Sequence, residues 1–114
     1  MTVAIKGYAQ GGENALHAHP DEDHVFVILQ GEATYHDADG QVLVLGRHEG
    51  VLVPHGVLYR FESSGDEQLV LLRTGAGPRE QTYHRVGPDG EVIPARSAAN
   101  GYEEPVPIPG QFFE

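Results

Sequence analysis

Short apolar runs alternate with glycine- and proline-containing turns along most of this 114-residue chain. No window keeps apolar residues at helical spacing for three turns. The pattern predicts short strands over residues 2–9, 15–19, 23–30, 32–36, 41–45, 51–53, 57–62, 68–74, 81–86 and 91–93. The run 23–30 is apolar on both faces, so we expect a fully buried central strand there. Many short strands with close spacing predict an all-β sandwich or barrel.

The last part of the chain differs from the rest because closely spaced prolines prevent regular strand pairing. We therefore expect one β-barrel domain over residues 1–93 and an extended proline-rich tail over residues 94–114. Phe112 and Phe113 near the end of the tail would be exposed on an isolated monomer. This predicts that the tail packs on the barrel or on a partner subunit, and that the protein is a homodimer.

Charge and composition exclude several function classes. The formal net charge is −10 and the few basic residues form no patch, which argues against nucleic acid or anionic membranes as partners. The chain has no cysteine, so disulfides, thiolate metal sites and thiol catalysis are excluded. The longest apolar run, Val25–Leu29, is too short to span a membrane. The first twenty residues do not resemble a signal peptide, so we expect a cytoplasmic protein.

Three of the seven histidines, His17, His19 and His24, fall within eight positions. On a strand, residues two apart face the same way and lie roughly 6–7 Å apart, so His17 and His19 can aim at one point. His24 begins the next expected strand and can join them. Three imidazoles of this kind would hold Zn, Fe, Mn, Ni or Cu. The alternative is that they are exposed loop histidines beside the acidic run 21–23. One carboxylate of that run is a candidate to orient a ligand histidine.

The spacing of these residues resembles a known pattern. Gly11, five residues, His17-Ala-His19, four residues, His24, six residues and Gly31 resemble the first motif of the cupin family. In that motif a glutamate normally stands where His24 stands here. Pro54-His-Gly56 resembles the second motif, with Tyr59 at the place of the usual fourth ligand, a histidine. The resemblance covers about residues 3–75 and implies an antiparallel jelly-roll barrel with its ligands at the mouth.

The resemblance implies one divalent transition metal held by His17, His19, His24 and Tyr59. Tyr59 has three open roles: metal ligand as phenolate, catalytic acid or base, or lining of an open coordination position. Neutral imidazoles keep the full charge of the metal, which favours an anionic small-molecule ligand. We therefore expect a metalloenzyme of the dioxygenase or isomerase class that acts on a compact organic anion. The alternatives are a non-catalytic binding or sensing cupin, and a metal-free barrel that acts through its assembly.

Other residues have simpler expectations. Three histidines are expected at the surface: His36, His48 and His55. Four apolar residues are expected in the core or in a pocket wall: Phe26, Ile28, Val57 and Phe61. Arg60 and Arg73 are expected to point outward into salt bridges, whereas His84 is a candidate to face the barrel mouth.

Overall fold

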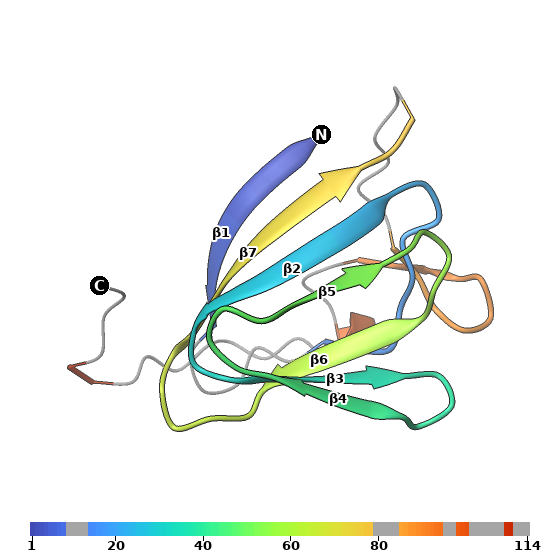
Figure 1. Cartoon of the computed structure of the whole chain (residues 1–114). Helices are drawn as coiled ribbons and strands as arrows, with labels where there is room; N and C mark the ends of the chain where they lie inside the picture. The colour runs from blue at the N-terminus through green and yellow to red at the C-terminus, as the bar shows by residue number, and fades with distance from the viewer. Residues whose placement is uncertain (9–13, 79–84, 95–97, 101–108, 111–114) are drawn as a thin grey trace.

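The computed structural model describes residues 1–8, 14–78, 85–94, 98–100 and 109–110. Two antiparallel sheets make up the barrel, as Figure 1 shows. The larger sheet has the strand order β1-β7-β2-β5, and the smaller sheet has the order β4-β3-β6. The expected all-β jelly-roll architecture is thus confirmed.

The element bounds follow the predicted runs closely. The larger sheet contains β1 (Thr2–Tyr8), β7 (Leu69–Ala76), β2 (Asp23–Gln30) and β5 (Gly50–Val53). The smaller sheet contains β4 (Val42–Leu45), β3 (Ala33–Asp37) and β6 (Tyr59–Ser63). A two-stranded ribbon, β8 (Arg85–Val86) with β9 (Val92–Ile93), and the short 3₁₀ helix η1 (Ala98–Asn100) complete the described elements. Among the described residues, no helix has the length and apolar character needed to cross a bilayer.

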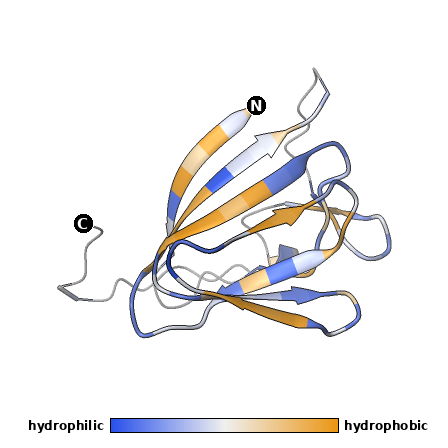
Figure 2. Ribbon diagram, viewed as in Figure 1, coloured by the Kyte–Doolittle hydropathy of each residue, from blue (hydrophilic) through white to orange (hydrophobic). Residues whose placement is uncertain are grey.

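Both sheets contribute to one buried core. Its aromatic centre joins the sheets: the ring centroids of Tyr35 and Phe61 are 5.1 Å apart, and Phe26 lies 5.8 Å from Phe61. Aliphatic members of the core are Ile28, Leu45, Val53, Leu69 and Leu71. Figure 2 shows the most hydrophobic segments on β2, β4 and β5. Removal of this apolar surface from water is the main favourable term in folding.

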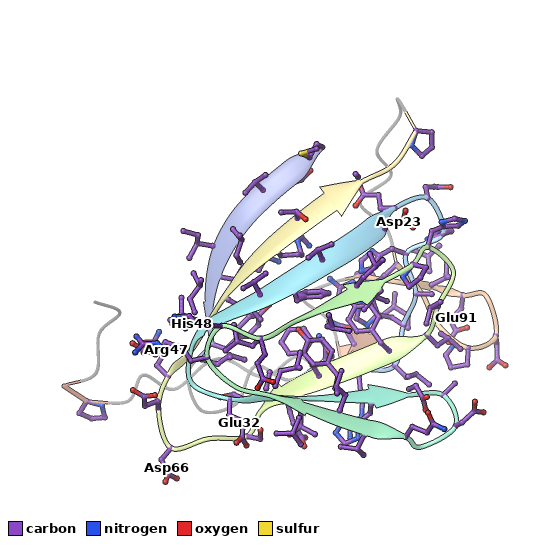
Figure 3. All side chains as sticks on the ribbon, viewed as in Figure 1. Asp23, Glu32, Arg47, His48, Asp66 and Glu91 are labelled. Atoms are coloured by element: carbon purple, nitrogen blue, oxygen red, sulfur yellow. The ribbon has the colours of Figure 1, made fainter. Side chains whose placement is uncertain are left out.

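Charged side chains gather at the ends of the strands and in the turns. Figure 3 labels examples at the periphery of the barrel, among them Asp23, Glu32, Arg47, Asp66 and Glu91. In the tight turn after β3, Gly40 adopts a φ of 80°, as expected for this position. The surface placement of these groups keeps them hydrated.

The prediction that β2 is buried on both faces is wrong. Burial alternates along the strand: His24, Phe26 and Ile28 face the interior, whereas Val25 is 38% exposed. The apolar run hides this alternation because its outward positions are also aliphatic. Only one face of the larger sheet packs on the core, and no described element covers the other.

The expected strand over residues 15–19 is reduced to two isolated bridges. His17 exchanges backbone hydrogen bonds of 2.9 and 2.8 Å with Tyr59, and Ala18 exchanges bonds of 2.8 and 2.9 Å with Val86. The segment therefore runs between β6 and β8. Strand β6 begins at Tyr59 and not at Val57, because the Val57 amide donates to the Pro54 carbonyl at 3.2 Å and closes a turn.

Some expectations fall on residues outside the described ranges. These are the first four residues of the run 81–86, with His84, and most of the tail, with Phe112 and Phe113. Packing of the tail and the homodimer therefore stay predictions.

Candidate metal centre

Three histidines meet at one end of the barrel interior. The ring centroid of His19 lies 5.0 Å from that of His17 and 4.0 Å from that of His24. The exposed fractions of the three residues are 1% for His17, 8% for His19 and 2% for His24. The bridged segment supplies the first two, and the start of β2 supplies the third. They are not exposed loop histidines, so that alternative is wrong.

Hydrogen bonds orient two of the three imidazoles. His17 Nδ1 lies 2.7 Å from the Ala15 carbonyl oxygen, which only accepts, so Nδ1 carries the proton and Nε2 keeps a lone pair. His24 Nε2 lies 2.8 Å from Oε2 of Glu22 and donates to it. Consequently His24 Nδ1 keeps the lone pair, and this atom is buried without a hydrogen-bond partner. Each of these two rings thus keeps one nitrogen with a lone pair that is able to bind a cation.

Glu22 is the carboxylate of the acidic run that orients a histidine, a role the sequence did not assign to a particular residue. Strand β7 makes room for it, because Gly75 is paired with His24 across the sheet. A Cβ atom at Gly75 would lie 2.9 Å from Glu22 Oε2 and 3.2 Å from His24 Nε2. The second carboxylate oxygen, Oε1, is buried without a hydrogen-bond partner.

Tyr59 lies against this cluster. Its ring centroid is 4.6 Å from that of His17, and its hydroxyl oxygen is 3.3 Å from His19 Nε2. Burial raises the pKa of the Tyr59 hydroxyl, so the side chain is a neutral phenol in the metal-free protein. The second motif therefore places its tyrosine within reach of the histidines, as the resemblance implied.

The histidines are neutral over a wide pH range. Burial lowers the pKa of His17 to about 4, and the nearby charge of Arg85 lowers it as well. Burial also lowers the pKa of His19 to about 2, together with the charges of its two histidine neighbours. The pKa of His24 is lowered by burial, partly offset by its hydrogen bond to Glu22. Neutral imidazole is the form that binds a metal.

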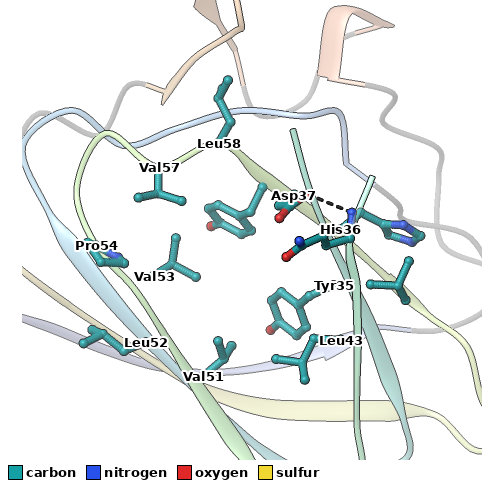
Figure 4. A pocket seen from close by; sticks show the side chains of 13 residues that line it. Tyr35, His36, Asp37, Leu43, Val51, Leu52, Val53, Pro54, Val57 and Leu58 are labelled. Carbon is teal, nitrogen blue, oxygen red and sulfur yellow. Dashed lines mark hydrogen bonds between the residues drawn. The ribbon is translucent and has the colours of Figure 1, made fainter. Parts of the chain in front are cut away.

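Tyr59 also lines a cavity of about 350 Å³ between β5 and the β3–β4 hairpin (Figure 4). Its walls are mainly aliphatic, including Leu43, Val51 and Val53, so it suits the organic part of a small ligand. Val57, expected in the core or in a pocket wall, lines this cavity and is 43% exposed. The Tyr35 hydroxyl at its wall is buried without a hydrogen-bond partner.

The donor set has the chemistry of a transition-metal site. Three neutral imidazoles suit Zn, Fe, Ni or Cu. His24 Nδ1 and Glu22 Oε1 are buried lone-pair atoms that have no hydrogen-bond partner. As the side chains lie, however, no group of three or more histidine, aspartate or glutamate residues in the described ranges is arranged to hold a metal ion. The residue types therefore fit a metal, and ring rotations would be needed to close the site.

The remaining predicted residues lie elsewhere. His55 is exposed and its Nδ1 lies 2.9 Å from Asp23 Oδ1, as expected for an outward position. His36 Nε2 lies 3.3 Å from Glu62, which also pairs with Arg60 at 3.5 Å. Arg60 is thus outward, as expected.

The expectation for Arg73 is wrong. This residue is paired with Phe26 across the sheet and faces the barrel interior, because directly paired residues share a face. An arginine that follows a run of apolar residues does not reveal its face in the sequence. Two further interior cations, Lys6 and Arg85, were not identified from the sequence as site residues.

Comparisons with known proteins agree with this architecture. The family model of the cupin domain matches residues 5–75. An uncharacterized protein of Bacillus subtilis, YdbB, is 36% identical over 52 residues, and the match covers 46% of each chain. This chain thus spans just under half of that relative.

Solved structures show the same fold. A conserved Klebsiella pneumoniae protein with a double-stranded β-helix domain has a TM-score of 0.61 at 25% identity, over 69% of each chain. A predicted oxalate decarboxylase of Thermotoga maritima has a TM-score of 0.60 at 24% identity, over 66% of this chain and 64% of that chain. With the family match over residues 5–75, the chain belongs to the cupin family.

Proposed function

We propose that this cupin binds one divalent transition metal through His17, His19 and His24, with Tyr59 beside the remaining positions. The observation that carries the proposal is the convergence of three buried imidazoles, two of them oriented by hydrogen bonds that leave one nitrogen free. The His24 nitrogen that would bind the metal has no protein partner. A buried polar atom without a partner is costly, and a metal ion would remove that cost.

The site is suited to a metalloenzyme that acts on a compact organic anion. A bound metal would supply a Lewis acid for a carbonyl or carboxylate, or a site for oxygen, as in the dioxygenase and isomerase classes. The chain itself would contribute Glu22, which orients His24, and Tyr59, a neutral phenol able to donate a proton. The aliphatic cavity beside Tyr59 would hold the apolar part of a ligand.

A specific observation favours a second candidate, a non-catalytic binding or sensing cupin. Tyr59 stands at the place of the usual fourth ligand, and its hydroxyl lies 3.3 Å from His19 Nε2, one of the nitrogens a metal needs. A site with only three ligands and a neutral phenol can hold a small molecule without converting it.

The first experiment is a titration of the metal-free protein with Co²⁺, followed by its visible absorption. We expect saturation at one equivalent with bands of a nitrogen-ligated ion, and no such bands for His17→Ala or His19→Ala. The exposed His55→Ala is the matched control and should titrate like the wild type. Equal titration by His17→Ala and the wild type would reject the ligand assignment.

A second experiment separates enzyme from binding protein. Metal-loaded protein is incubated with a panel of small oxo- and hydroxy-carboxylates, in air and under argon, and followed by NMR. Conversion only in air indicates oxygenase chemistry, and conversion under both atmospheres indicates an isomerase. Ligand binding without conversion would support the non-catalytic alternative.

A further inference from the structure

Two cationic side chains of the larger sheet lie on the same face as its buried core. Arg73 on β7 is paired with Phe26 on β2 and with Ala4 on β1. Directly paired residues share a face, and Phe26 is 2% exposed, so this face is the interior one. Lys6 lies two residues after Ala4 and therefore faces inward as well. Lys6 and Arg73 are diagonal neighbours, a separation of about 7–8 Å that long side chains can reach across.

Strand β8 brings a third cation to the histidines. Ala18 and Val86 form an antiparallel bridge through two backbone hydrogen bonds. In an antiparallel register, the residue after Ala18 is opposite the residue before Val86. Arg85 therefore lies opposite His19.

The cations lie beside the histidine cluster and affect one another. Arg73 is the diagonal neighbour of His24 across β2 and β7, on the same face of the sheet. Burial, together with the charges of Arg73 and Arg85, lowers the pKa of Lys6 itself to about 8. The three cations are therefore close enough to repel one another.

These three cations have no ion-pair partner among the residues that the structure describes. The Nε atoms of Arg73 and Arg85 are buried without a hydrogen-bond partner. By contrast, Arg60 at the surface pairs with Glu62, and Arg47 donates to the Leu29 carbonyl at 2.9 Å.

Such an arrangement is unfavourable unless a ligand completes it. Half-buried charges of one sign repel each other and lose hydration. The chain carries 17 acidic residues against 7 basic ones, so acidic side chains are not scarce. Unpaired interior cations lower the stability of the fold. Such a loss of stability is typical of a site that binds a ligand.

We propose that Lys6, Arg73 and Arg85 bind a compact dicarboxylate inside the barrel, beside the histidine cluster. Three positive charges, less the one carboxylate of Glu22, leave two positive charges for a dianion to neutralise. A guanidinium group binds a carboxylate through two parallel hydrogen bonds, and two arginines match two carboxylates. This inference deepens the proposed function by naming the ligand class, and it does not depend on the metal because all three cations belong to the chain.

The test is calorimetric titration of the full chain, freed of metal on a chelating resin, with malonate and with malonamide. We expect malonate to bind and its neutral diamide to bind at least about tenfold more weakly. Arg73→Gln and Arg85→Gln should each weaken malonate binding about tenfold to a hundredfold. Arg60→Gln, which removes the same charge at the surface, should leave malonate binding unchanged.

The outcomes separate this inference from the metal proposal. Equal affinities for malonate and malonamide, or unchanged malonate affinity in Arg73→Gln and Arg85→Gln, would overturn it. Inorganic phosphate bound as tightly as malonate would overturn the assignment to carboxylates. The ligand-free melting temperature of Arg73→Gln should not fall, since an unpaired charge is removed. A lower melting temperature with unchanged malonate affinity would assign Arg73 a structural role. Because this titration uses metal-free protein, a failed Co²⁺ titration would reject the metal proposal and leave the malonate result standing.

Discussion

Glu22 and His24 form a buried hydrogen bond in which Oε2 of the carboxylate lies 2.8 Å from Nε2 of the imidazole. The bond leaves Nδ1 of His24 as the nitrogen with the lone pair and raises the basicity of the ring. Gly75 allows the pair to exist, because it is paired with His24 and has no side chain. Three residues from two strands and a loop thus determine which nitrogen of His24 keeps its lone pair.

The first prediction concerns this pair. Gly75→Ala places a methyl group against Glu22 Oε2, so it should break the hydrogen bond and lower metal affinity about tenfold to a hundredfold. The control is Gly46→Ala, where a Cβ would meet only the flexible Glu49 side chain at 3.4 Å. Metal affinity is measured by competition with a chelating dye. An unchanged affinity in Gly75→Ala would show that the Glu22–His24 pair does not support metal binding.

The second prediction uses the difference between this chain and the usual cupin motif. His24→Glu restores the common ligand, but it places a second carboxylate beside Glu22, and the two like charges repel. We expect His24→Glu alone to bind metal poorly and the double variant with Glu22→Gln to recover most of the binding. The same dye competition measures both. Equal affinities of the single and double variants would contradict the contact between positions 22 and 24.

The sequence was sufficient for the architecture because turn residues and short apolar runs mark strands independently of tertiary contacts. The sequence was misleading about which side chains of a strand point into the core. In β1, Val3 and Ile5 alternate with Ala4 and Lys6, and the apolar pair would ordinarily be placed inside. The structure exposes Val3 at 61% and Ile5 at 65%, and turns Lys6 inward.

Only part of the candidate site was predicted from the sequence. The spacing of the histidines revealed their convergence, since residues two apart share a side of the chain. The role of Arg85 depends on contacts between distant segments, such as the bridge from Ala18 to Val86. No local pattern contains that information.

The third prediction distinguishes the roles of Tyr59. Tyr59→Phe removes the hydroxyl near His19 and keeps the ring that packs 5.7 Å from Phe26, so the fold should be retained. Because burial keeps the phenol protonated, we expect full metal stoichiometry in Tyr59→Phe and loss of any turnover. A loss of metal would instead identify Tyr59 as a ligand. Retention of both metal and turnover would leave it as a wall of the site.

The fourth prediction concerns acid stability of the metal-free protein. The folded-state pKa values of His17 and His19, about 4 and about 2, lie below the unfolded value of 6.5. The unfolded chain therefore binds more protons below that value, and stability is lost as the pH falls from 6.5 toward 4. One such proton contributes at most about 1.4 kcal/mol per pH unit.

Urea unfolding of the wild type and of His17→Gln measures this loss. The wild type should show the steeper fall in unfolding free energy. Identical pH dependence in His17→Gln and the wild type would show that His17 is protonated as easily in the folded as in the unfolded state. The low pKa values also mean that metal should be retained below about pH 6, where ordinary histidines would lose it to protons.

The fifth prediction tests the central claim that the histidine cluster is a metal centre. Protein purified without chelators is analysed for metal by mass spectrometry, as wild type and as His17→Ala and His55→Ala. We predict about one equivalent of a divalent transition metal in the wild type and in His55→Ala, and almost none in His17→Ala. No bound metal in the wild type, or the same content in His17→Ala, would contradict the claim.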